Sequence, residues 1–155
     1  MRQIKKLYIA YGSNMNQAQM RQRCPAARVV GTAMLRGYRL LFRGAYRCAV
    51  ATIEPYPSGA VPVVVWEITP ECEAALDLYE GYPHLYEKEI VKLRLAEKPA
   101  RAMVYVMTAG RLPGVPSAYY YKTILEGYAD AGFDTEALKR ATVESAEAYE
   151  MAVNG

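Results

Sequence analysis

Histidine and cysteine are scarce in this chain, and their scarcity excludes several kinds of site. The 155 residues include one histidine and three cysteines. A single histidine excludes every site that needs two imidazoles, including the common zinc centres, and leaves few ways to build a Ser–His–Asp relay. The cysteines Cys24, Cys48 and Cys72 are odd in number and widely spaced, so they do not indicate a disulfide framework. We therefore expect free thiols, a cytoplasmic location and no metal site.

Long hydrophobic runs and blocks of one charge are also missing. The apolar run near the N-terminus is too short for a signal sequence and far too short to span a bilayer. The formal net charge is +3, but lysine and arginine are scattered along the chain, whereas nucleic-acid-binding proteins cluster them. We expect a soluble protein with neither nucleic acid nor a membrane among its partners.

What the chain does contain is an ordinary globular composition with one excess. Hydrophobic residues make up 52% and charged residues 23%, which argues against disorder. No repeat, low-complexity stretch or linker interrupts the chain, so we predict a single domain over residues 1–155. Tyrosine is the excess, with 14 residues against two phenylalanines and one tryptophan.

Short strands separated by glycine and proline dominate the first two thirds of the chain. Runs of β-branched and aromatic residues predict seven strands, at residues 6–10, 28–35, 38–42, 48–53, 61–68, 87–95 and 102–107. Capping signals predict four helices, at residues 16–24, 69–80, 117–129 and 134–152. Thr69, Ser117 and Asp134 are the expected N-caps of the last three helices, and Gly81 is the expected left-handed end of the second. This pattern predicts an α+β protein with an antiparallel sheet or a small barrel.

The turn that begins at Tyr11 is the first candidate binding site. A strand ends there in a glycine and a helix begins just after, so unpaired backbone N–H groups can hold a carboxylate or phosphate. Gly12 allows the backbone to approach a ligand closely, and Ser13 and Asn14 add side-chain donors. A plain strand–turn–helix connection with Asn14 or Asn16 as N-cap is the alternative. The GxxxxGK[ST] pattern of phosphate-binding P-loops is absent.

Glu80 is the candidate for proton transfer. The predicted helix turns Cys72, Ala75, Leu76 and Tyr79 to one apolar face, and Glu80 falls on or beside that face at the helix C-terminus. Burial and the negative end of the helix dipole both disfavour a carboxylate, so we expect a raised pKa, which suits proton transfer at pH 7. A salt bridge at a frayed helix end is the alternative.

A third candidate is the segment with three consecutive tyrosines. Tyr120, Ile124, Gly127 and Tyr128 share one helical stripe, a pattern that more often belongs to a core. Gly127 costs helix stability, so we expect it to pack closely against another backbone or to keep space open. His84 lies in a Pro-His-Leu turn, where we expect it to be exposed rather than catalytic.

Three segments together resemble the γ-glutamylcyclotransferase family, which includes the AIG2-like proteins and the γ-glutamylamine cyclotransferases. Residues 8–15 read Tyr-Ile-Ala-Tyr-Gly-Ser-Asn-Met, similar to the family's Tyr-Gly-Ser-Asn loop. Residues 76–83 read Leu-Asp-Leu-Tyr-Glu-Gly-Tyr-Pro, similar to the Glu-Gly segment that bears the family's catalytic carboxylate. Residues 116–120 read Pro-Ser-Ala-Tyr-Tyr and, with Ile124 and Gly127, resemble a third family segment. The three motifs stand in the family's order and cover most of the chain.

The resemblance implies a small mixed, largely antiparallel β-barrel of about six or seven strands with surrounding helices. It implies a cofactor-independent enzyme that releases 5-oxoproline and a free amine or amino acid from a γ-glutamyl amide, by attack of the substrate's own α-amine. Glu80 would be the general acid/base of this reaction. The residues implied to bind the substrate are Tyr8, Ile9, Ala10, Tyr11, Gly12, Ser13, Asn14 and Tyr120. The expected partner is a small γ-glutamyl compound, and the expected state is a monomer or a weak homodimer.

Two other function classes stay open at the level of sequence. One is a non-catalytic small-molecule binding protein that keeps the fold and the pocket. The other is a hydrolase with Ser13 or Cys24 as nucleophile and His84 as its base.

One departure from the family pattern also matters. The family often has glycine where residues 63–66 read Val-Val-Val-Trp, so Trp66 would reshape the pocket if it faces inward.

Overall fold

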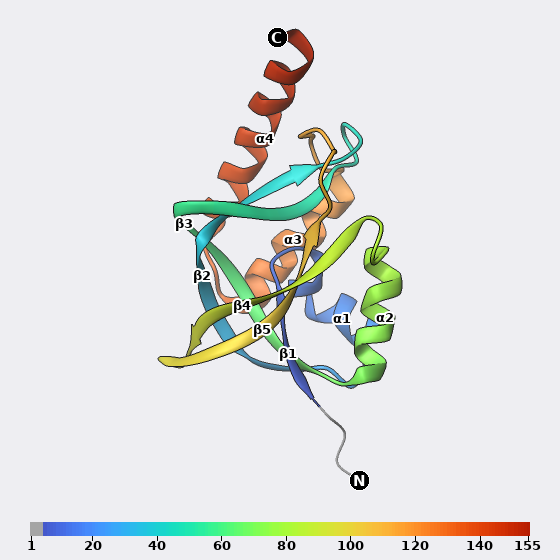
Figure 1. Cartoon of the computed structure of the whole chain (residues 1–155), viewed down its shortest axis with the longest axis vertical. Helices are drawn as coiled ribbons and strands as arrows, with labels where there is room; N and C mark the ends of the chain where they lie inside the picture. The colour runs from blue at the N-terminus through green and yellow to red at the C-terminus, as the bar shows by residue number, and fades with distance from the viewer. Residues whose placement is uncertain (1–4) are drawn as a thin grey trace.

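A computed structural model describes residues 5–155. Residues 1–4, at the start of the N-terminal segment that is expected to be too short for a signal sequence, lie outside the described residues. The described part contains five strands and four α-helices, arranged as Figure 1 shows. The strands are β1 (Lys6–Ala10), β2 (Arg28–Arg43), β3 (Val50–Ile68), β4 (Tyr86–Leu95) and β5 (Lys98–Met107). The helices are α1 (Gln17–Arg23), α2 (Pro70–Glu80), α3 (Ala118–Ala131) and α4 (Glu136–Asn154), with a 3₁₀ turn, η1, at Ser13–Met15. None of these helices is long and apolar enough to cross a membrane.

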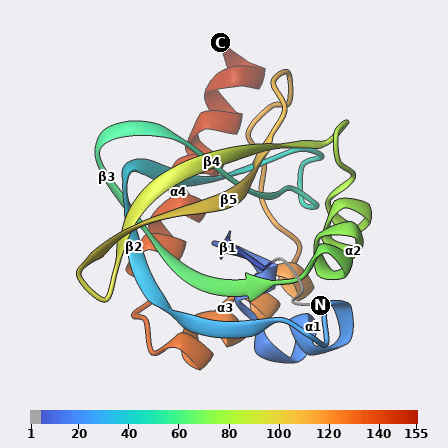
Figure 2. The ribbon, with the colours of Figure 1, turned by 60° about the horizontal axis from the view of Figure 1, so that its bottom comes forward.

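The strands form one mixed sheet in the order β2-β3-β1-β5-β4. Only the central pair, β1 and β5, is parallel, and the other neighbours are antiparallel. The α+β class and the mixed, largely antiparallel sheet are therefore confirmed. The barrel of six or seven strands needs correction, because the sheet of residues 5–155 has five strands and its edges are not hydrogen-bonded to each other. The sheet is nevertheless strongly curved, so that β2 and β4 approach each other (Figure 2).

The strand count is lower because residues that looked like separators bend two long strands instead. Opposite Gly37, the pairing of β2 with β3 jumps from Arg36–Ala60 to Tyr38–Pro55. The four residues between Pro55 and Ala60 bulge out of the ladder, and Gly37 takes the left-handed φ of +86° that this irregularity requires. Pairing resumes on both sides, so one bent ladder replaces four short strands.

The helix signals read from the sequence are confirmed at α1, α2 and α3. Asn16 caps α1 by accepting from the N–H of Gln19, and Thr69 caps α2 by accepting from the N–H of Cys72. Gly81 ends α2 with a φ of +67°. Ser117 caps α3 through the N–H of Tyr120.

The start of α4 differs by one residue from the prediction. Thr135 stands at the N-cap position without a side-chain bond, and Asp134 accepts from the N–H of Glu136 at 3.1 Å. The helix packs on β2, where the Ser145 hydroxyl accepts from the N–H of Phe42 at 2.9 Å. This contact satisfies a backbone group on the outer strand of the sheet.

The fold concentrates loops and helix ends at the C-terminal end of β1. From there the chain runs into η1 and α1, while α3 packs directly on η1. Gly127 makes this packing possible, since a Cβ at its position would lie 2.8 Å from the Met15 Cβ and 2.9 Å from the Asn16 nitrogen. The predicted close approach of Gly127 to another backbone is thus confirmed.

Candidate active site

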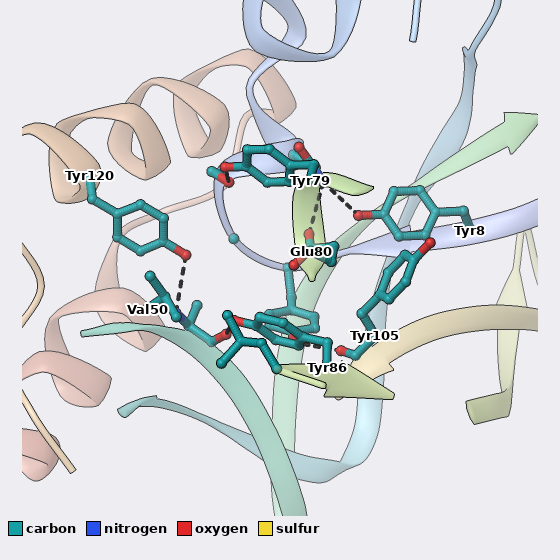
Figure 3. Close-up of a pocket in the computed structure, with 13 residues that line it drawn as sticks. Tyr8, Val50, Tyr79, Glu80, Tyr86, Tyr105 and Tyr120 are labelled. Carbon is teal, nitrogen blue, oxygen red and sulfur yellow. Dashed lines mark hydrogen bonds between the residues drawn. The ribbon is translucent and has the colours of Figure 1, made fainter. Parts of the chain in front are cut away.

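A pocket of about 230 Å³ opens beside the C-terminal end of β1 (Figure 3). Its walls come from segments that are far apart in sequence, namely β1 and the turn after it, the start of β3, the end of α2, the start of β4, β5 and α3. Six of its thirteen lining residues are tyrosines, and Glu80 is the one carboxylate among them. The lining residues are Tyr8, Tyr11, Gly12, Ser13, Asn14, Val50, Ala51, Tyr79, Glu80, Leu85, Tyr86, Tyr105 and Tyr120.

Most of the residues expected to act together do line this one pocket. Glu80, Tyr120 and the segment from Tyr11 to Asn14 converge there from α2, α3 and the turn after β1. Ile9 and Ala10 do not line it, because their side chains are buried in the core.

Glu80 is the last residue of α2, and its half-buried carboxylate points into the pocket (Figure 3). Its Oε1 accepts from Nδ2 of Asn14 at 3.3 Å. Burial raises the pKa of Glu80 to about 7, and the nearby charge of Arg23 opposes that rise. Both protonation states are therefore populated near neutral pH, so the carboxyl group can accept a proton and later return it.

Asn14 is held on every polar atom of its side chain. Nδ2 donates to the Tyr8 hydroxyl at 2.9 Å as well as to Glu80, and Oδ1 accepts from the Arg23 guanidinium. The backbone carbonyl accepts from Nε1 of Trp66 at 3.1 Å. Trp66 does not line the pocket. It supports the turn from behind, so it shapes the site by fixing the loop rather than by filling the cavity.

Tyrosine hydroxyls form hydrogen bonds with the backbone at the start of β3, where a neighbouring strand is missing. The Tyr120 hydroxyl accepts from the N–H of Ala51 at 3.0 Å, and the Tyr86 hydroxyl donates to the carbonyl of Ala51 at 2.5 Å. In the same way, the Tyr11 hydroxyl donates to the carbonyl of Tyr105 at 2.7 Å. Burial raises the pKa of Tyr11, Tyr86 and Tyr120, so these phenols stay neutral at pH 7.

Sequence reasoning missed about half of the lining residues. Tyr86 and Tyr105 enter from β4 and β5, and nothing local distinguishes them from other strand tyrosines. Tyr79 belongs to the predicted apolar face of its helix, yet its hydroxyl lies 3.0 Å from Oγ of Ser13. The tyrosine excess was the available signal, because six of the 14 tyrosines meet here. The other missed residues are Val50, Ala51 and Leu85.

The arrangement that a Ser or Cys hydrolase needs is not assembled. His84 is exposed in the turn after α2, as predicted, and does not line the pocket. The partner of the Ser13 hydroxyl is Tyr79 rather than a base. Cys24 is buried, and burial raises the pKa of its thiol to about 12, which disfavours a thiolate. Within residues 5–155, no group of three or more His, Cys, Asp or Glu side chains is placed to hold a metal ion.

Comparison with known families agrees with this geometry. Residues 8–123 match the family model described as "Gamma-glutamyl cyclotransferase, AIG2-like". The matched span contains the turn after β1, Glu80 and Tyr120, and so includes all thirteen residues that line the pocket. A search of curated proteins found no match.

Several solved structures share the fold. One is titled "Gamma-glutamyl cyclotransferase", with 28% identity and a TM-score of 0.80 over 89% of this chain and 86% of that one. A second is an uncharacterized protein from Homo sapiens, with 28% identity and a TM-score of 0.79 over 88% and 86% of the two chains. A γ-glutamyl cyclotransferase from yeast, described as specific to glutathione, has 13% identity and a TM-score of 0.62 over 94% and 96%. At that identity the likeness concerns the fold alone.

Proposed function

This chain belongs to the γ-glutamyl cyclotransferase, AIG2-like family, and we propose that it releases 5-oxoproline from a small γ-glutamyl amide. The other product is a free amine or amino acid. The observation that carries the proposal is the half-buried Glu80 carboxyl group, which is the one carboxylate in a small, tyrosine-rich pocket. Burial raises its pKa to about 7, the range in which one group can act first as a base and then as an acid.

The size of the pocket supports a small acyl group as the enclosed part of the substrate. Pockets for drug-sized ligands have volumes of roughly 300–1,000 Å³, and this one has about 230 Å³. A γ-glutamyl group fits such a space, with the amine that will leave directed toward the opening. The tyrosine hydroxyls offer hydrogen-bond partners along the wall.

In the proposed reaction the substrate supplies its own nucleophile. Ionised Glu80 takes a proton from the α-ammonium group, and the freed amine attacks the γ-carbonyl carbon to close a five-membered ring. The bond between that carbon and the leaving nitrogen then breaks, while Glu80 gives its proton to the departing amine. The ring nitrogen loses its second proton to the ionised Glu80 or to solvent as it becomes the amide nitrogen of 5-oxoproline. Oriented intramolecular attack can reach effective molarities of about 10⁵–10⁸ M, so the mechanism requires no cofactor and no covalent enzyme intermediate.

The turn after β1 offers donors for the negative charge of the substrate. Within residues 5–155, the backbone N–H groups of Gly12, Ser13 and Asn14 have no acceptor. Such groups at the first turn of a helix can bind a carboxylate or a developing oxyanion. We assign the glutamyl α-carboxylate or the carbonyl oxygen of the reacting amide to them.

A panel of γ-glutamyl amides, scored for 5-oxoproline release, tests the proposal. We expect release from at least one member, with kcat/KM falling as the pH drops below about 7, where Glu80 becomes protonated. Glu80→Gln should lower kcat by about 10²- to 10⁴-fold, the usual contribution of general acid–base catalysis. Glu71→Gln is the matched control, because Glu71 is exposed in the first turn of the same helix. Full activity in folded Glu80→Gln would contradict the mechanism.

Absence of release from every member of the panel would favour the non-catalytic alternative. In that case a γ-glutamyl amide should still bind, and calorimetric titration would detect it.

We further propose that the protein acts in the cytoplasm, in line with its three free cysteines, one of which is exposed. We also propose that it is a monomer or a weak homodimer.

A further inference from the structure

Arg23 lies outside the pocket but contacts two of the residues that form it. It is the last residue of α1, half-buried, and it is not part of the pocket lining. Its guanidinium donates to Oδ1 of Asn14 and, at 3.0 Å, to Oε1 of Gln19. Its Cζ also lies 3.5 Å from the centroid of the Tyr79 ring. One planar cation therefore joins the turn after β1 to the end of α2.

The contact with Asn14 determines which end of the carboxamide faces Glu80. A carboxamide has an acceptor end and a donor end, and rotation by 180° exchanges them. Arg23 has only donors, so it requires the oxygen of Asn14. The amino group is then left for the Tyr8 hydroxyl and the carboxylate of Glu80. The opposite orientation would place Nδ2 against the guanidinium and an oxygen against the carboxylate.

The contact with Tyr79 holds a second wall of the pocket. Residue Tyr79 is 44% exposed, so packing against the core alone restrains its ring little. The guanidinium covers one face of the ring, and the hydroxyl of Tyr79 lies 3.0 Å from Oγ of Ser13. A cation over an aromatic face contributes to this restraint in addition to the hydrogen bond.

We propose that Arg23 is a positioning residue, which orients the Asn14 amide and the Tyr79 ring around Glu80 without contacting the substrate. This inference rests on the proposed role of Glu80 in proton transfer. Helix α1 thus contributes to the site through Arg23, which holds the turn after β1 and the end of α2 in position relative to each other. The chemistry itself stays with Glu80 and the substrate.

Arg23 is also the positive charge that acts on Glu80. Its field lowers the pKa of Glu80, while burial raises it. The carboxylate of Asp77, one turn earlier on α2, is paired with Lys88 at 2.8 Å. The remaining titratable groups around the carboxyl are phenols. They are Tyr8, Tyr11, Tyr79, Tyr86, Tyr105 and Tyr120. Without Arg23, the pKa of Glu80 should rise further above 7.

Three substitutions separate charge, geometry and general stability. Arg23→Met removes the charge and all donors at similar volume. Arg23→Lys keeps the charge but loses the planar group that stacks and forms two hydrogen bonds. Arg21→Met is the matched control, because Arg21 is exposed two positions earlier on the same helix. The pH dependence of kcat/KM and the pH response of the Asn14 side-chain amide signal in ¹H–¹⁵N NMR are measured for each.

We expect Arg23→Met to lower kcat by about 10- to 100-fold, the effect of losing a hydrogen bond to a charged group, and to move the acidic limb of the pH profile to higher pH. Arg23→Lys should keep the limb near its original position while kcat stays reduced. The Asn14 amide signal should follow the titration of Glu80 in the wild-type protein and in Arg21→Met, and should lose that response in Arg23→Met.

Two results would overturn the proposal. One is an Arg23→Met protein with the kcat and acidic limb of Arg21→Met. The other is a reduced kcat with an unchanged acidic limb and an unchanged Asn14 response, which would indicate a merely structural role. The NMR measurement needs no turnover. If the wild-type protein released no 5-oxoproline, the proposed function would fail, while the amide response would still decide whether Arg23 orients Asn14.

Discussion

Glu80→Gln should stabilise the folded protein at pH 8, although it removes the proposed acid/base group. Burial raises the pKa of Glu80 from 4.5 to about 7. A difference of about 2.5 between the folded and unfolded values corresponds to about 3 kcal/mol, at about 1.4 kcal/mol per pH unit. Above pH 7 the free energy of unfolding is lower by this amount, because the carboxyl group must ionise in a site that disfavours its charge.

The pH dependence follows from where each state holds its proton. The raised folded-state pKa means that the folded state keeps a proton which the unfolded state releases between pH 4.5 and 7. The contribution of Glu80 to stability is therefore fully present below pH 4.5, falls as the pH rises to 7, and stays low above it. Glutamine has no proton to lose, and its oxygen can still accept from Asn14. The variant should match the wild type at pH 4 and exceed it by about 3 kcal/mol at pH 8.

Urea unfolding of both proteins at pH 4 and pH 8 measures the difference directly. In thermal unfolding at pH 8, the melting temperature of Glu80→Gln should be higher than that of the wild type by about 6–12 °C for a domain of this size. Glu71→Gln serves again as the control, since Glu71 is exposed and should show no such dependence. Equal stability differences at the two pH values, or a less stable variant at pH 8, would refute the argument that burial controls this carboxyl group.

Two further predictions concern the packing around the site. Gly127→Ala should lower the free energy of unfolding, because a Cβ 2.8 Å from the Met15 Cβ costs about 1–3 kcal/mol and helix propensity returns only about 1 kcal/mol. Thermal unfolding checks this, and an unchanged or raised melting temperature would show that α3 and η1 can separate freely. Tyr120→Phe should lower the free energy of unfolding by about 1–3 kcal/mol, because the N–H of Ala51 loses its acceptor. Urea unfolding measures the loss, and no change would mean that solvent replaces the hydroxyl.

Local signals in the sequence were sufficient for the helices. Thr69 and Gly81 set the two ends of α2, and both act through neighbouring backbone groups within one turn. The same holds for Ser117 at α3 and Asn16 at α1. A cap needs only the residues beside it, so its effect can be read without knowledge of the fold.

Strand boundaries were less predictable, because they depend on partners. Gly37 and the residues after Pro55 have the chemistry of turns, and in isolation they would end a strand. In the sheet they face each other as one irregularity, and the ladder continues on both sides. Whether a turn-forming residue ends a strand or bends it is decided by the strand that pairs with it.

The same distinction between local signals and distant partners applies to the candidate site. The sequence by itself determined the turn from Tyr11 to Asn14 and the position of Glu80 at a helix end, because each depends on nearby residues and a local motif. Only the tertiary structure decided that tyrosines from β4 and β5 complete the wall and that Arg23 orients the Asn14 amide. These contacts join segments that are distant along the chain, and the curvature of the sheet and the packing of helices bring them together.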